Sequence, residues 1–177
     1  YDELSYELIE TILVTEDIRY YEHSGIDLRG LIRAGYGVFK NIITLGQTGL
    51  EGGGSTITQQ LAKNLFKTRK MKGKLTEVPG IGIFIVKLKE WIVAIQLEKF
   101  YTKKEILSMY LNTAEFGSNS YGIKVASDTY FKKSPSEINY NEAAILVGLI
   151  NKPTKYNPIY NPFQNIQSYI FKSVIWL

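Results

Sequence analysis

The chain has 177 residues, of which 45% are hydrophobic and 21% are charged, a composition that supports a sizeable core and argues against a disordered chain. The absence of cysteine excludes a disulfide framework and a thiolate metal site. The net charge of +4 suits an anionic partner, but no run of Lys and Arg has the density of a nucleic-acid-binding tail, so we expect no nucleic-acid partner.

The sequence contains no stretch that is long and apolar enough to span a membrane. Its longest apolar run, residues 78–86, is far shorter than the ~20 residues of a spanning helix. The chain starts at Tyr1, without an initiator Met or a signal peptide. We therefore expect a fragment of a longer protein whose membrane anchor lies upstream.

Helical periodicity predicts two helices in the first quarter of the chain. The first covers residues 3–17 and ends at the acidic pair Glu16-Asp17. The second covers residues 27–45 and carries Arg29 and Arg33 on one face. This second stretch fits a buried core helix and a patch that dips into the membrane interface equally well, and both interpretations stay open.

A glycine-rich loop over residues 46–54 leads into the next predicted helix. Ser55 is the expected N-cap of this helix. Its expected buried stripe consists of Ile57, Leu61 and Leu65. Residues 69–79 are basic and rich in turn formers, which predicts a second loop.

The rest of the chain is also predicted to be helical. Residues 81–86 fit a short strand or the first turns of a helix that ends near residue 100. The side chains expected to point inward from this helix are Leu88, Trp91, Ile92 and Ile95. Residues 102–105 form a capping box for a helix with Ile106, Leu107, Tyr110 and Leu111 buried. Further helices are expected over residues 122–131 and 140–150, the latter after N-cap signals at Ser134 and Asn139.

Glu16 and His23 are the first candidates for chemistry. A carboxylate at the end of an apolar helix loses hydration, which raises its pKa towards the range of a general base, although position alone favours a solvated acid at a helix end. His23 is the only histidine, and we expect it to bond a loop and orient its neighbours. No second His or Cys is available to join it in a metal site.

A second group of candidates starts at the turn that contains Gly54. This turn leads into a helix N-terminus, which attracts anions. Gln59 and Lys63 share a face of the helix that follows. Lys87 and Glu90 also share a face, and such spacing means either an ordinary surface salt bridge or a carboxylate held among cations that face a diphosphate. Farther along, Asn112, Glu115 and Asn119 either line a groove or belong to a polar loop.

These segments resemble, in order, five motifs of the peptidoglycan glycosyltransferases, the lysozyme-like transglycosylase domain of bifunctional penicillin-binding proteins. The matching segments are residues 16–25, 54–60, 87–90, 106–123 and 142–158. The resemblance implies one mainly α, lysozyme-like domain over residues 1–177, with a small apolar, membrane-facing subdomain at residues 27–50. Val86 departs from the family, which usually has Arg there, and Arg69 or Lys70 is a candidate to supply the missing charge.

The resemblance also implies a reaction and a place in the cell. The enzyme would polymerise lipid II into β-1,4 glycan strands with inversion and release undecaprenyl diphosphate. Its partners would be lipid II, the growing lipid-linked glycan and the membrane surface, on the periplasmic face of the bacterial cytoplasmic membrane. A C-terminal transpeptidase domain in the parent chain is compatible with this picture. No cofactor is required, although a divalent cation, Mg²⁺ or Mn²⁺, could assist the diphosphate.

Residue roles follow from the same resemblance. Glu16 would be the base that deprotonates the acceptor hydroxyl, and Glu90 the second acidic residue, near the leaving diphosphate. The expected substrate-binding residues are Ser55, Thr56, Gln59, Gln60, Lys63, Arg69, Lys87, Lys89 and Asn112. The expected structural or orienting residues are Asp17, His23 and Gly54.

Two other functions remain open. A lysozyme-like hydrolase or lytic transglycosylase would also use two carboxylates, but it has no need of cations for a diphosphate. A non-catalytic scaffold that binds lipid II would have no need of both Glu16 and Glu90.

Overall fold

The computed structural model describes residues 1–44, 54–66 and 81–159. In these ranges the regular structure is helical apart from one isolated antiparallel bridge between Glu115 and Tyr121, so the predicted mainly α class is confirmed. None of the described helices has the length and apolar character needed to cross a membrane. The chain divides into two compact units, Tyr1–Ile18 with Lys103–Leu177 and Arg19–Thr102. The first unit is therefore assembled from two separate stretches of sequence.

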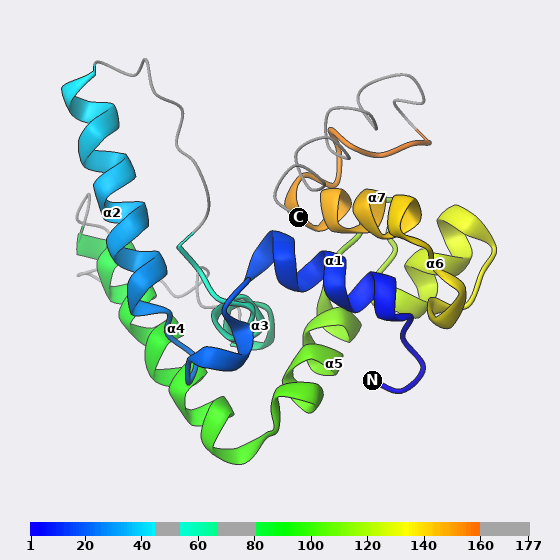
Figure 1. Ribbon diagram of the computed structural model, residues 1–177, viewed down its shortest axis with the longest axis horizontal. Helices are drawn as coiled ribbons and strands as arrows, with labels where there is room; N and C mark the ends of the chain where they lie inside the picture. The colour runs from blue at the N-terminus through cyan, green and yellow to red at the C-terminus, as the bar shows by residue number, and fades with distance from the viewer. Residues whose placement is uncertain (45–53, 67–80, 160–177) are drawn as a thin grey trace. The chain divides into compact units, whose positions relative to one another are not determined.

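The first unit is helical throughout its described regular structure. Its helices are α1 (Tyr6–Glu16), α5 (Lys103–Thr113), α6 (Ile123–Phe131), the short 3-10 helix η4 (Pro135–Glu137) and α7 (Tyr140–Asn151). Helices α1 and α7 pack side by side (Figure 1). Both bury apolar side chains, including Leu8 of α1 and Leu146 of α7. The four α5 residues predicted to be buried, Ile106, Leu107, Tyr110 and Leu111, are buried.

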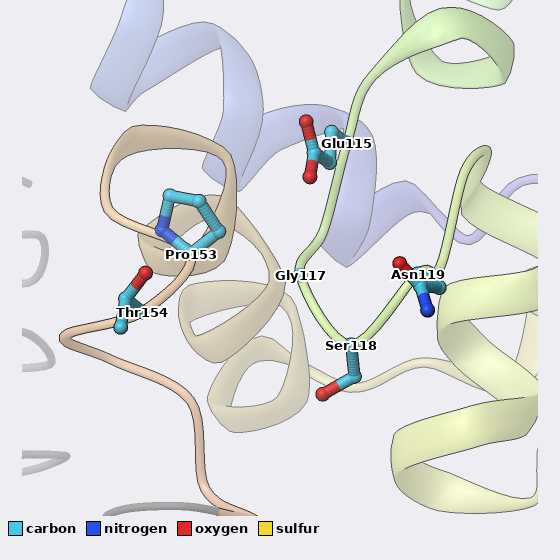
Figure 2. Close-up of a pocket in the computed structure, with 6 residues that line it drawn as sticks. All are labelled: Glu115, Gly117, Ser118, Asn119, Pro153 and Thr154. Atoms are coloured by element: carbon cyan, nitrogen blue, oxygen red, sulfur yellow. The ribbon is translucent and has the colours of Figure 1, made fainter.

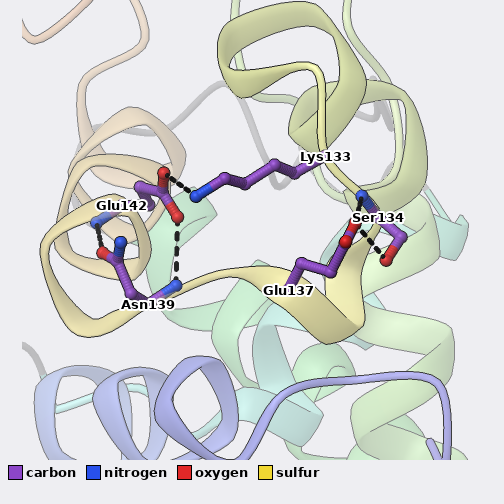
Figure 3. Close-up of polar contacts among 5 residues, drawn as sticks. All are labelled: Lys133, Ser134, Glu137, Asn139 and Glu142. Atoms are coloured by element: carbon purple, nitrogen blue, oxygen red, sulfur yellow. Dashed lines mark hydrogen bonds and ion pairs between the residues drawn. The ribbon is translucent and has the colours of Figure 1, made fainter.

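A cluster of polar contacts fixes the start of α7 (Figure 3). The backbone N–H of Glu142 donates to Oδ1 of Asn139, and the backbone N–H of Asn139 donates to Oε2 of Glu142, both at 3.0 Å. Lys133 Nζ donates to the other carboxylate oxygen of Glu142 at 2.7 Å. Just before this, Glu137 accepts from the backbone N–H of Ser134 at 2.9 Å. Both N-cap predictions, at Ser134 and Asn139, are confirmed.

The second unit is also helical in its described residues. Its elements are η1 (Tyr20–Glu22), α2 (Leu28–Ile43), α3 (Ile57–Phe66) and α4 (Ile81–Phe100). Helix α3 packs against α4. Residues 81–86, for which the sequence left a strand open, form the first turns of α4.

Gly25 brings the segment after η1 into contact with α4. A Cβ atom at this position would lie 2.9 Å from both the carbonyl carbon and the carbonyl oxygen of Ala94. The φ angle of Gly25 is +88°, which a residue with a side chain adopts only with strain. Close backbone approach and backbone conformation therefore both require glycine here.

The inward face of α4 differs from the predicted one. Gly82, Glu90, Ala94 and Leu97 are buried and Trp91 is half-buried, whereas Ile92 is 57% exposed and Leu88 and Ile95 are each 37% exposed. Apolar residues occur all around this helix, so hydrophobic periodicity does not distinguish its faces. On α3, Ile57 and Leu61 are buried as predicted, but Leu65 is 43% exposed near the end of the helix.

Helix α2 exposes large apolar side chains along its length. Leu28, Ile32, Tyr36 and Ile43 are between 64% and 74% exposed. Arg29, Arg33 and Lys40 are exposed on the same helix. A plain core helix would bury these apolar residues, but on α2 these four side chains are exposed.

Candidate active site

Glu16 is the last residue of α1 and contacts the far end of α7. The Nδ2 atom of Asn151, the last residue of α7, donates a hydrogen bond to Oε1 of Glu16 at 2.5 Å. The ring of Tyr110 from α5 is fully buried, and burial raises the pKa of its phenol well above the usual value, with a further contribution from the negative charge of Glu16. The backbone N–H of Asp17 donates to the carbonyl of Leu13 at 3.0 Å and ends the helix. The carboxylate thus lies where the end of α1 contacts the end of α7, close enough to Tyr110 of α5 to act on it electrostatically.

The N-terminus of α3 is tied to the carbonyl oxygen of Gly25. Thr56 Oγ1 donates to this oxygen at 2.8 Å, and Gln59 Nε2 donates to it at 3.1 Å. The backbone N–H of Gln59 donates to Thr56 Oγ1 at 3.2 Å, so Thr56 and not the predicted Ser55 is the N-cap. Two adjacent residues that both cap helices well leave this boundary undecided in the sequence.

Thr56 and Gln59 are nearly inaccessible, at 2% and 1% exposure. Their donors hold the segment around Gly25, while Oε1 of Gln59 is buried without a hydrogen-bond partner. In this structure both residues serve to join two motifs, and their predicted contact with substrate stays a prediction.

The segment from Arg19 to Asp27 is folded by its own polar contacts. Nδ1 of His23 accepts a hydrogen bond from the backbone N–H of Gly25 at 3.2 Å. The ring of His23 stands edge-on to the ring of Tyr20, with 6.3 Å between centroids. Arg19 donates to both carboxylate oxygens of Asp27, at 3.2 and 2.5 Å. The hydrogen bond from Arg19 holds the pKa of Asp27 below its ordinary value.

Lys87 connects the α3 entrance to a buried carboxylate. Its Nζ atom lies 2.8 Å from Ser55 Oγ and 2.8 Å from Oε2 of Glu90. The side chain of Glu90 is only 2% exposed, whereas that of Lys87 is 34% exposed. The sequence left open an ordinary surface salt bridge, and that interpretation is wrong because the acid is buried. A buried carboxylate requires such a partner, since an unpaired charge in the interior is costly.

A second contact between α3 and α4 was not predicted from the sequence. Thr58 Oγ1 donates to Oε1 of Glu98 at 2.6 Å. Thr58 lies within the matching segment 54–60, but Glu98 lies outside all five segments, and no local pattern connects two residues that are 40 positions apart. Asn151, the partner of Glu16, was missed for the same reason, because the two are separated by 135 residues.

The remaining predicted site residues fall into three groups. Gln60, Lys63 and Lys89 are half-buried on α3 and α4. Gly54 is also half-buried, and a Cβ atom there would lie 3.1 Å from Cβ of Ala34. Asn112 is exposed on the last turn of α5, in the first unit. Arg69 lies outside the described residues, as do most of the glycine-rich loop and the chain after residue 159.

A polar pocket of about 300 Å³ opens in the first unit (Figure 2). It is lined by Glu115, Gly117, Ser118, Asn119, Pro153 and Thr154. Glu115 and Asn119 were candidate groove residues, and they line this pocket, whereas Asn112 does not. A Cβ atom at Gly117 would lie 2.8 Å from the carbonyl oxygen of Pro153, so glycine allows the two walls to approach.

In the part of the chain that the structure describes, no three or more His, Asp or Glu side chains are grouped so that they could hold a metal ion. A magnesium ion held by one or two carboxylates and the phosphates of a substrate needs no such group, so the predicted assistance by Mg²⁺ or Mn²⁺ stays a prediction.

The comparisons with known proteins agree with the sequence motifs. A family model described as Transglycosylase matches residues 1–174. The chain is 40% identical over 164 residues to penicillin-binding protein 1F of Bacillus subtilis, covering 93% of this chain and 21% of that protein. It is 39% identical to penicillin-binding protein 1A of Vibrio cholerae and 35% identical to that of Escherichia coli, each over 90% of this chain and 17% of the relative. The chain thus spans about one fifth of the length of these relatives, and it belongs to the transglycosylase family of peptidoglycan glycosyltransferases.

Proposed function

We propose that this chain polymerises lipid II into β-1,4 glycan strands and releases undecaprenyl diphosphate. Membership of the family supports the glycosyltransferase class. The observation that carries the finer proposal is the position of Lys87, whose ammonium group joins Ser55 at the entrance of α3 to the buried carboxylate of Glu90. This places a cation and a helix N-terminus together, a combination suited to a diphosphate.

Glu16 is the proposed general base. The 4-hydroxyl of the lipid II acceptor attacks the anomeric carbon of the donor glycan, and Glu16 takes the hydroxyl proton. The new glycosidic bond forms as the bond between the anomeric carbon and the diphosphate oxygen breaks, with inversion at carbon. The hydrogen bond that Glu16 accepts from Asn151 at the end of α7 supports this role, because a base must be held in a defined geometry.

Cations replace a strong general acid in this scheme. A diphosphate is a good leaving group, so neutralising the charge that develops on it is sufficient. Lys87 is the proposed principal contact, with Glu90 holding it in place. The other proposed contacts to the donor are Ser55, Gln60, Lys63, Lys89 and Arg69, and Asn112 is a further proposed substrate-binding residue. Thr56 and Gln59 support the site by fixing Gly25.

Helix α2 supports a location at the membrane surface. It exposes apolar side chains and carries exposed Arg29, Arg33 and Lys40, which suits an interface with anionic lipid head groups. We propose that residues 27–50 form the membrane-facing part of a lysozyme-like domain on the periplasmic face of the cytoplasmic membrane. We further propose that the parent protein also contains a transpeptidase domain.

The test is incubation of the chain with fluorescent lipid II in detergent, with products separated by size. The expected result is a ladder of growing glycan that lysozyme digests. If the folded chain produces no ladder but binds lipid II, the scaffold function is favoured instead. Preformed glycan added to a parallel reaction should remain intact, and its conversion to short fragments would identify a hydrolase.

A further inference from the structure

We propose that Asn151 is a positioning residue that aims the carboxylate of Glu16. This inference rests on the proposed role of Glu16 as the general base. The two side chains meet at 2.5 Å, with Asn151 Nδ2 as donor and Glu16 Oε1 as acceptor. They come from opposite ends of the chain and are brought together by the packing of α1 against α7.

The surroundings determine which way the Asn151 amide faces. Its nitrogen lies between two acceptors, Oε1 of Glu16 and the carbonyl oxygen of Val147 at 3.4 Å. An amide nitrogen carries two N–H groups, so it serves both acceptors, whereas the amide oxygen would be repelled by both. The amide therefore presents a donor to Glu16 and is oriented by its own helix.

A neutral donor suits a base better than a cation would. A hydrogen bond from an amide fixes the direction of a carboxylate, while a directly paired Lys or Arg would also depress its basicity strongly. Asn151 therefore supplies a directed hydrogen bond without placing a second charge beside Glu16.

Helix α7 is a rigid support for this contact. Its last turn, which carries Asn151, is closed by the Lys152 N–H, which donates to the carbonyl of Gly148 at 3.0 Å. A base aimed from a helix end is held more closely than one aimed from a loop. Because small misplacements of reacting groups reduce turnover strongly, the loss of this contact should act on the chemical step.

The test compares three variants in the lipid II assay. Asn151→Leu removes the donor at similar volume, and Asn151→Gln keeps an amide on a longer arm. Asn139→Ala is the matched control, because it weakens the cap at the opposite end of the same helix. Thermal unfolding of all three variants shows whether they are folded and how far each is destabilised.

We expect Asn151→Leu to lower kcat about 10- to 100-fold, with KM for lipid II within about twofold of the wild type. Asn151→Gln should recover part of that loss. Asn139→Ala should lower kcat less than about threefold, even though the loss of a helix cap lowers the stability of the protein. The inference is overturned if the wild type makes glycan and Asn151→Leu matches it, or if Asn139→Ala lowers kcat equally. A wild type that makes no glycan would instead overturn the proposed function.

Discussion

Replacement of Lys87 by Met should destabilise the protein, because it removes a cationic partner of the buried Glu90 carboxylate. The side chain of Glu90 is 2% exposed, and Lys87 Nζ forms an ion pair with its Oε2 atom at 2.8 Å. Breaking a buried ion pair typically costs about 3–5 kcal/mol. Lys87 itself is 34% exposed, so water reaches part of the pair, and we expect a loss of about 2–3 kcal/mol. For a chain of this length that corresponds to a fall in Tm of about 4–12 °C.

The assay is reversible urea unfolding of Lys87→Met, Glu90→Gln and the double variant. The double variant should recover to within about 1 kcal/mol of the wild type, because a neutral amide needs no cation. The matched control is Lys132→Met, since Lys132 pairs with Asp128 at 3.7 Å on the surface with 77% and 71% of the side chains exposed. This control should change stability by less than about 0.5 kcal/mol. A loss for Lys87→Met no greater than that of the control would refute the reasoning.

Three other predictions follow from the same structure. Glu16→Gln should leave thermal unfolding nearly unchanged and lower glycan synthesis more than ~100-fold, and wild-type turnover would rule out its role as base. Gly25→Ala should lower the free energy of unfolding by at least about 2 kcal/mol, as measured in urea, because its Cβ would meet the Ala94 backbone at a φ of +88°. We also expect the protein to become less stable as the pH is lowered below about 4.5, which thermal unfolding at a series of pH values would measure. The pKa of Asp27 is lowered by the hydrogen bond from Arg19. Burial of Glu142 opposes the hydrogen bonds from Lys133 and Asn139, which still hold its pKa below 4.5. A carboxyl whose pKa is lower in the folded than in the unfolded state stabilises the fold at every pH above its unfolded-state pKa. This stabilisation is lost as the pH falls through the folded-state pKa and the carboxyl becomes protonated. Asp27→Asn should flatten the decline, and an unchanged acid profile in that variant would contradict the assignment.

Local signals in the sequence predicted the helices well. The capping residues Ser134 and Asn139 correctly predicted the starts of η4 and α7, because a cap and its helix are only a few residues apart. The same local character limited the prediction at the start of α3, where Ser55 and Thr56 are both good caps. Only the contact of Thr56 with Gly25, from a distant part of the chain, selects one of them.

The candidate site was predictable in its residue types but not in its contacts. The spacing of Lys87 and Glu90 predicted a pair, yet it could not say that the acid is buried, because α4 is apolar on all sides. Nothing in the sequence predicted a role for Asn151. Its role depends on the packing of α7 on α1, and no periodicity or cap connects residues so far apart.

The divided first unit has a consequence for synthesis on the ribosome. Helix α1 emerges first, but α7, against which it packs, is completed only when Asn151 has been made. The intervening residues 19–102 form a unit of their own and have their partners available earlier. Contacts between distant parts of a chain form slowly, so α1 waits while the second unit folds. A nascent or truncated chain that ends before Asn151 would therefore carry Glu16 without its hydrogen bond from α7, and this contact can form only once α7 is complete.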